Sequence, residues 1–138
     1  MRQATTTLSF RTSGQGFLDA TARIGDWVEA QGMEEGLLTL FIRHTSASIL
    51  VQENADPDVL ADLGQALDRL APRTHPYLHR TEGPDDMPAH IKAALTATSL
   101  AIPLIGGHLA LGTWQGIYIA EHRDRPHSRE VACHLVGE

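Results

Sequence analysis

Apolar and polar residues alternate or run together in segments that predict a series of strands. Residues 5–12 alternate, with Leu8 and Phe10 on one side, which predicts a first strand. Residues 36–44 form a nearly continuous apolar run, typical of a central strand, and residues 48–52 predict another strand after a polar break. Near the end of the chain we expect a hairpin of residues 99–105 and 108–111, a strand that opens the segment 112–129, and a last strand at 130–136.

Apolar residues at helical spacing predict about three helices between these strands. The first starts at Phe17 and ends near Gly32, a glycine suited to a helix C-terminus. The second starts at Asp56–Pro57, because aspartate caps a helix and proline suits its first turn, and the third starts at Asp85–Asp86. The order of elements predicts an α+β fold with a largely antiparallel sheet, in a single domain over residues 1–138.

Composition and charge favour some classes of protein over others. The net charge is −6 and there is no basic run, which argues against general nucleic-acid binding but leaves a local anion site open. Neither a signal peptide nor an apolar run long enough to span a membrane is recognisable, so we expect a cytoplasmic protein. The single cysteine, Cys133, rules out an internal disulfide. Eight histidines make a metal or acid–base site worth seeking.

The first candidate for chemistry is the segment 44–48, at the end of a predicted strand. Here His44 lies beside the hydroxyls of Thr45, Ser46 and Ser48, which suits the binding of a water, a phosphate or a substrate hydroxyl. A serine nucleophile with His44 as its base is a second interpretation, weakened because no Gly-x-Ser-x-Gly motif is present. In the third, the hydroxyls only satisfy backbone groups of a turn.

The second candidate is the segment 79–90, which follows a long loop rich in proline. Two histidines and three carboxylates offer ligands for zinc or another divalent ion, although their spacing matches no compact zinc motif. The alternative is structural: an aspartate caps the helix and His90 lies at the surface.

The third candidate is the strand that opens the segment 112–129. Gly112 and Gly116 flank Thr113–Trp114–Gln115, which favours a close backbone approach or a bulge. The strand ends in Glu121, His122 and Arg123, three polar side chains that packing alone does not readily explain. If these three candidate segments converge, histidines and carboxylates would hold a metal, while arginines, hydroxyls and Lys92 would hold a phosphate or diphosphate.

At these residues the chain resembles the YjbQ-like family of secondary thiamine-phosphate synthases. The matching segments are HTSAS at 44–48, QENADPDV at 52–59, EGPDDMPAHIK at 82–92 and GTWQGIYIAEHR at 112–123. The resemblance implies an antiparallel α+β fold, a homotrimer with its site near subunit boundaries, and weak coupling of an aminopyrimidine diphosphate to a thiazole phosphate. Leu78 and Arg80 depart from the family, which carries acidic residues there.

Site roles follow from this resemblance and from the chemistry above. We expect a divalent ion, zinc or magnesium, and a phosphorylated small metabolite as the partner. Two other functions stay open: a non-catalytic trimer that binds a metal or phosphometabolite, and a metal-dependent hydrolase. The expected catalytic residues are His44, Ser46, Glu121 and Arg123; the substrate-binding residues are Asn54, Asp56, Lys92 and Trp114; and the metal ligands are His79, Asp86, His90 and His122.

Overall fold

The computed structural model describes residues 1–138, with three helices and eight strands. The helices are α1 (Thr21–Ala30), α2 (Pro57–Leu70) and α3 (Asp86–Leu95). The strands are β1 (Arg2–Arg11), β2 (Gly16–Asp19), β3 (Gly36–Ile42), β4 (Ala47–Glu53), β5 (Ser99–Ile105), β6 (His108–Leu109), β7 (Gln115–Glu121) and β8 (Ser128–Gly137).

The strands form two sheets, and every pairing is antiparallel. The larger sheet has the order β1-β8-β3-β5-β6 and the smaller one the order β2-β7-β4. Apolar side chains of both sheets and of α1 share one core, to which β3 contributes Leu38 and Leu40, and β7 contributes Ile117 and Ile119. The predicted α+β fold is confirmed, whereas its division into two sheets was not predicted.

Two of the three predicted helix starts are confirmed, and one is wrong. The Asp56 side chain accepts a hydrogen bond from Asp58 N at the start of α2, as an N-terminal cap does. Phe17, however, lies in β2 and pairs with Ala120 of β7. Its spacing relative to later apolar residues is helical, but pairing with β7 decides its conformation. The helix α1 begins only at Thr21.

Gly116 is a place of close approach, as its position beside Thr113–Trp114–Gln115 indicated. A Cβ atom there would lie 3.0 Å from the Tyr118 ring and 3.3 Å from Asn54 Cβ. A larger residue would therefore separate β7 from the end of β4. The strand β7 itself begins at Gln115, later than the predicted start at Gly112.

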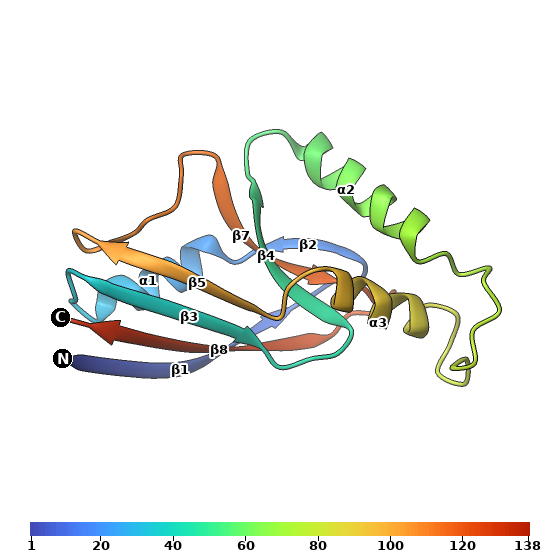
Figure 1. Ribbon diagram of the computed structural model, residues 1–138, viewed down its shortest axis with the longest axis horizontal. Helices are drawn as coiled ribbons and strands as arrows, with labels where there is room; N and C mark the ends of the chain where they lie inside the picture. Colours follow the sequence, from blue (N-terminus) through green and yellow to red (C-terminus); the bar gives the residue numbers. More distant parts are fainter.

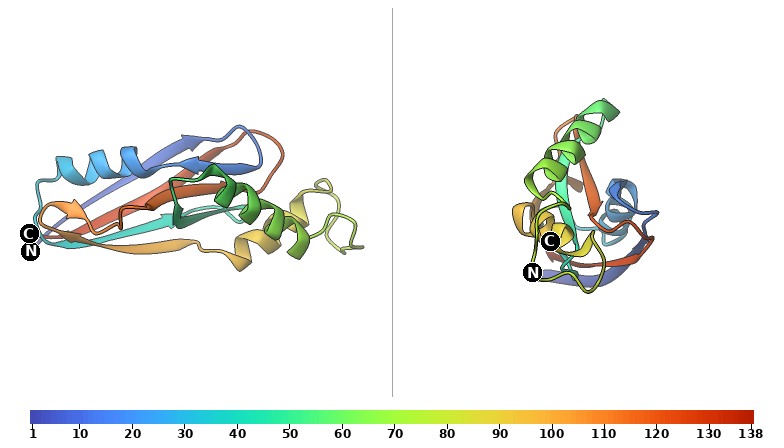
Figure 2. Two further views of the ribbon diagram at one scale, coloured as in Figure 1. Left: turned by 90° about the horizontal axis from the view of Figure 1, so that it is seen from above. Right: turned by 90° about the vertical axis from the view of Figure 1, so that its right-hand side faces the viewer.

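The elements of interest gather at one end of the molecule. In Figure 1, α3 and the loop 71–85 lie at the end opposite to both chain termini. Helix α2 projects from the body in both Figure 1 and Figure 2, and Leu67 is its only buried residue. None of the three helices combines the length and apolar character needed to cross a membrane.

Candidate functional site

The end of β7 sends three successive side chains to three different partners. Glu121 binds Arg129 of β8, while His122 lies against Ser48 of β4. Arg123 reaches the start of α3, where it binds Asp85 and Asp86. Successive side chains of a strand point to opposite faces, so neighbours in sequence can belong to separate sites.

His79, Asp86 and His90 form what we call the His–Asp–His cluster. The Asp86 Oδ2 atom lies 2.6 Å from His79 Nε2 and 3.1 Å from His90 Nε2. The three potential ligand atoms all lie within 4.8 Å of one another. Asp86 and His90 share a face of α3 because they are one helical turn apart, and the loop 71–85 brings His79 to them.

Hydrogen bonds outside the cluster orient its side chains. His90 Nδ1 lies 2.9 Å from the Thr45 carbonyl oxygen, which can only accept, so Nδ1 carries a proton. Arg123 Nη1 donates to Asp86 Oδ1 at 2.7 Å, leaving Oδ2 directed toward the two histidines. A carbonyl behind the imidazole and an arginine behind the carboxylate are the supports that metal-binding side chains usually have.

Both aspartates at the start of α3 are ionised at neutral pH. Burial raises the pKa of Asp86, but the hydrogen bond from His79 and the charges of His90 and Arg123 outweigh it and lower the pKa. Burial also raises the pKa of Asp85, but hydrogen bonds from Arg123 and from the Asp124 backbone lower it to about 2. Asp85 makes no capping hydrogen bond to α3, because its carboxylate holds Arg123 and Asp124 N instead.

Glu121 belongs to a closed group of side chains, which we call the Arg129 network. Arg129 Nε donates to Glu121 Oε1 at 2.9 Å, its Nη2 donates to the other carboxylate oxygen, and Thr12 Oγ1 donates to Oε1 at 2.6 Å. Arg129 Nη2 also donates to Ser46 Oγ at 3.0 Å. The Arg129 and Glu121 side chains are 4% and 2% exposed. This network ties the two sheets together at the base of the candidate site.

His44 is neutral and makes no hydrogen bond to Ser46. The backbone N–H of Glu130 donates to His44 Nε2 at 2.8 Å, so that nitrogen is an acceptor and the ring has no proton there. Burial and the charge of Arg129 lower the His44 pKa. The structure therefore does not pair His44 with Ser46 as base and nucleophile, and Ser46 Oγ is an acceptor for Arg129.

His122 does not join the His–Asp–His cluster. Its Nε2 atom lies 2.8 Å from the hydroxyl of Ser48, which also accepts a hydrogen bond from Thr96 Oγ1 at 2.7 Å. Burial and the nearby charge of Lys92 lower the pKa of His122 to about 4, so its imidazole is neutral at physiological pH. The expected fourth metal ligand is thus placed in a different environment from the other three.

The four expected substrate-binding residues also lie away from the cluster. Asn54 and Trp114 join at the far end of the β4–β7 pair, where Asn54 N donates to Trp114 O at 3.0 Å. That end is six residues from the pairing of Ala47 with Glu121, roughly 20 Å at about 3.3 Å per residue. Asp56 caps α2 near the same end, and Lys92 is buried on α3.

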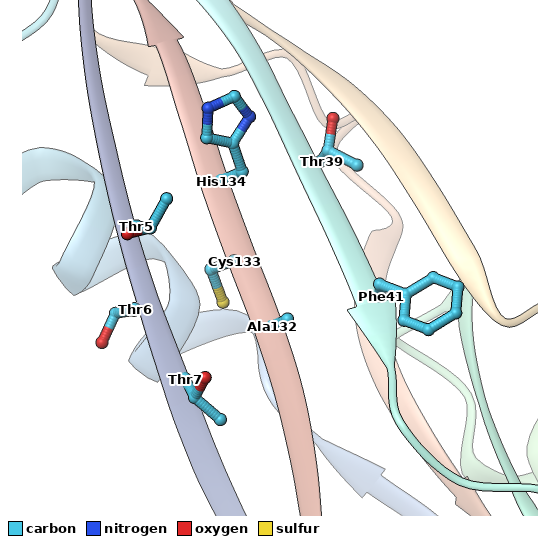
Figure 3. Close-up of a pocket in the computed structure, with 8 residues that line it drawn as sticks. All are labelled: Thr5, Thr6, Thr7, Thr39, Phe41, Ala132, Cys133 and His134. Atoms are coloured by element: carbon cyan, nitrogen blue, oxygen red, sulfur yellow. The ribbon is translucent and has the colours of Figure 1, made fainter.

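A cavity of about 320 Å³ adjoins the cluster. Its walls include His79, His75, Tyr77 and two arginines, Arg73 and Arg80, so it suits an anionic ligand. Figure 3 shows another cavity, of about 330 Å³, on the face of the larger sheet between β1, β8 and β3. Threonines are four of its eight lining residues, and it shares no residue with the cavity beside the cluster.

Arg129 and Arg73 bind residues of the candidate segments but are not among the expected site residues. Arg129 occupies an inward position of β8, two residues before the buried Val131, and an arginine on an apolar strand face is a usable signal. Arg73 lies in the loop 71–85 and binds Asp124 through both carboxylate oxygens, at 2.7 and 2.5 Å. No periodic pattern surrounds Arg73, so nothing in its neighbourhood indicated this contact.

Known proteins similar to this chain cover nearly all of it. The family described as UPF0047 protein YjbQ-like matches residues 6–138. The UPF0047 protein sll1880 of Synechocystis is 51% identical over 99% of this chain and 94% of its own, and the UPF0047 protein YjbQ of Salmonella typhimurium is 42% identical over 99% and 98%.

Solved structures agree with the fold. A crystal structure of an uncharacterized conserved protein of the yjbq/upf0047 family from Clostridium acetobutylicum has a TM-score of 0.87 at 39% identity, covering 95% of this chain and 99% of its own. A YbjQ-like protein of unknown function from Sulfolobus solfataricus has a TM-score of 0.88 at 20% identity, covering 99% and 100%, which shows a shared fold.

Proposed function

The chain belongs to the UPF0047 YjbQ-like family, and we propose that it is a metal-dependent transferase acting on phosphorylated small molecules. Weak thiamine-phosphate synthase activity is the specific reaction proposed, from the family resemblance. In this proposal His79, Asp86 and His90 hold a divalent ion, and the cavity beside them receives the anionic substrate.

The observation that carries the proposal is the convergence of three ligand atoms in the cluster. Because His90 Nδ1 donates to the Thr45 carbonyl, Nε2 is the ring nitrogen left to bind a cation, and it is directed at Asp86 Oδ2. Two atoms with lone pairs repel each other unless a proton or a cation lies between them. With His79 Nε2 converging on the same oxygen, a divalent cation satisfies all three atoms together.

The ligand types favour zinc over magnesium. Two imidazole nitrogens and one carboxylate oxygen are usual ligands of catalytic zinc, whereas magnesium prefers oxygen ligands and retains several waters. Three protein ligands also leave a coordination position for substrate. The ion would supply positive charge to a leaving diphosphate, which this acidic chain provides only locally.

Charged side chains around the cavity support an anionic substrate. Arg80 contributes a guanidinium group, whereas Arg73 is bound to Asp124. Tyr77 and His75 lie with their ring centroids 4.8 Å apart and offer aromatic surface for a heterocycle. Arg123 is committed to Asp85 and Asp86, so we assign it the orientation of the cluster instead of direct substrate contact. Arg80, a departure from the family pattern, adds positive charge to this cavity.

A homotrimer is a further part of the proposal. The Trp114 side chain is 63% exposed, and Leu37, Phe41 and Ile105 are 40%, 49% and 59% exposed, apolar surface that contact between copies would cover. Light scattering should report about three times the chain mass of 15.0 kDa, and a monomer would contradict this part. A cytoplasmic location likewise stays a proposal.

The second candidate function is a binding protein without turnover. It is supported by the neutral His44, whose Nε2 accepts from Glu130 N, and by the pairing of Glu121 with Arg129, because these were expected catalytic residues. In that case the cluster and its cavity would bind a metal and a phosphometabolite. Hydrolysis by a metal-bound water is a third possible function, and no separate observation favours it.

The experiment compares zinc content and diphosphate release in three proteins. These are the wild type, His90→Ala, and the control His108→Ala, which removes a histidine whose side chain is 78% exposed. Each is stripped with chelator, reloaded with zinc and analysed for bound metal. Each is then supplied with the aminopyrimidine diphosphate and the thiazole phosphate, and diphosphate is measured against a heat-inactivated sample.

We expect His90→Ala to lose the zinc and the diphosphate release, and His108→Ala to keep both. Zinc retained in His90→Ala would contradict the metal site. Zinc lost from His90→Ala while release continues unchanged would separate the reaction from the cluster. Zinc bound by the wild type without release above the heat-inactivated sample would favour the binding protein.

A further inference from the structure

Lys92 points away from the His–Asp–His cluster into a separate part of the molecule. It lies two residues after His90 on α3, a rotation of about 200° around the helix axis. The lysine is only 2% exposed. A buried ammonium group is costly unless it is paired, so its partner identifies what this place is built to hold.

The partner is a carboxylate held by two donors. Lys92 Nζ donates to Asp68 Oδ1 at 2.5 Å, and Gln15 Nε2 donates to the same oxygen at 2.9 Å. Arg73 Nη2 donates to Gln15 Oε1 at 3.3 Å, which directs the amide nitrogen of Gln15 toward Asp68. Burial raises the pKa of Asp68, but the hydrogen bonds from Lys92 and Gln15 outweigh it and lower the pKa.

Lys92 is firmly placed, whereas the Asp68 carboxylate and the Gln15 side chain are exposed. The Asp68 side chain is 56% exposed and comes from α2, which has one buried residue and projects from the body (Figures 1 and 2). Lys92, by contrast, lies on the side of α3 that faces the protein interior. Gln15 follows Gly14, which has a φ of +121°, and a Cβ there would lie 2.7 Å from the Asp124 carbonyl oxygen. The loop that carries Gln15 is therefore packed closely on the chain after β7.

Space for a ligand adjoins this carboxylate. A hollow of about 470 Å³ is lined by Asp68, Gln15, Phe17, Leu60 and Gly64. A smaller cavity of about 30 Å³, which reaches Lys92 itself, shares Gln15, Phe17 and Gly64 with that hollow. The small cavity at Lys92 therefore adjoins the larger hollow, which has both polar and apolar walls.

We propose that Lys92 and Gln15 form an oxyanion-binding site in which Asp68 is a built-in occupant. A phosphate or carboxylate group of a small ligand displaces Asp68 when α2 moves outward, and the body of the ligand lies beside Phe17 and Leu60. Phosphate and carboxylate share the chemistry that the two donors recognise. This site is distinct from the His–Asp–His cluster and stands without the proposed metal.

Removing the built-in occupant should increase the affinity of the site for external anions. We expect Asp68→Ala to bind inorganic phosphate or acetate at least about tenfold more tightly than the wild type, by isothermal titration calorimetry in the presence of chelator, because the internal competitor is gone. The matched control is Asp62→Ala, an exposed aspartate of the same helix, which should behave as the wild type. Asp68→Ala/Lys92→Met should lose the gain.

The anions and variants separate the outcomes. A larger gain for phosphate identifies a phosphorylated ligand, and a larger gain for acetate identifies a carboxylate. If Asp68→Ala and Asp62→Ala bind both anions alike, or if Asp68→Ala/Lys92→Met keeps the gain, the proposal is overturned. Asp68→Asn, which preserves the side-chain shape, replaces Asp68→Ala should that variant fail to fold. Neither zinc nor turnover enters the measurement, so failure of the proposed transferase would leave this result unaffected.

Discussion

Two arginines close to each other in sequence, Arg123 and Arg129, both bind carboxylates but in contrasting surroundings. Arg129 is 4% exposed and its partner Glu121 is 2% exposed, with further hydrogen bonds from Thr12 and to Ser46. Arg123 is 20% exposed, and its partner Asp86 presents a second oxygen to two histidines next to a cavity. In the Arg129 network the carboxylate is saturated by hydrogen bonds within the protein, whereas around Arg123 one carboxylate oxygen faces two histidines.

The two ion pairs differ in how exposed the arginine is and in how completely the carboxylate is hydrogen-bonded within the protein. In the Arg129 network every polar group has a hydrogen-bond partner within the protein. The network therefore stabilises the contact between the two sheets. Around Arg123, Asp86 Oδ2 and the two imidazoles make contacts that the proposed cation would replace. The pKa values of Glu121 and Asp86 are both lowered, so the direction of a pKa shift does not separate the two cases.

The largest expected effect tests the closed network. Arg129→Met should lower the free energy of unfolding by about 3–5 kcal/mol, because it leaves the Glu121 carboxylate buried and unpaired. Urea denaturation at pH 7 measures it. The double variant Glu121→Leu/Arg129→Met should recover part of the loss, since it removes both charges. A loss below about 1 kcal/mol for Arg129→Met would show that the network is dispensable for stability.

The next effect uses pH to test the neutral His122 beside the closed network. Its pKa is about 4 in the folded protein and about 6.5 when unfolded, so between these values the unfolded chain binds more protons. The free energy of unfolding should therefore fall by about 3 kcal/mol as the pH falls from 6.5 to 4. Denaturation of His122→Asn should show a flatter dependence in this window. If the free energy of unfolding falls equally steeply with pH in both proteins, a group other than His122 is responsible.

Substitution of Arg123 should change mainly the affinity of the His–Asp–His cluster for zinc. Arg123→Met removes the hydrogen bonds that orient Asp86, and we expect zinc affinity to fall by about 10–100-fold. Competition with a chelating dye measures it. The exposed Arg125, two residues later, provides the control Arg125→Met, which should keep the wild-type affinity. If both variants bind zinc alike, Arg123 does not orient the cluster.

The smallest effect comes from an arginine–carboxylate pair at the surface. Arg43 Nη1 lies 3.4 Å from Glu130 Oε2, with side chains 58% and 47% exposed. Solvent screens this pair, so Arg43→Ala should change the free energy of unfolding by less than about 0.5 kcal/mol. The same urea denaturation measures it. A change comparable to that of Arg129→Met would mean that burial is not what separates the three pairs.

Sequence patterns predicted most elements and part of the candidate site. Proline and aspartate located the start of α2, and apolar runs located β3 and β4. The segment 79–90 supplied His79, Asp86 and His90, which the structure brings together. Phe17 was misplaced because helical spacing and strand pairing were both compatible with its neighbourhood.

By itself, the sequence determined which segments carry chemistry and which residues face a core, because periodicity and capping act over a few residues. The tertiary structure decided the partners. His122 meets Ser48, 74 residues away, and Arg123 meets Asp86, 37 residues away. Glu121 turns to Arg129 because strand pairing places both side chains in the interior. Such contacts depend on how sheets and helices pack, and local spacing holds no information about distances between segments so far apart.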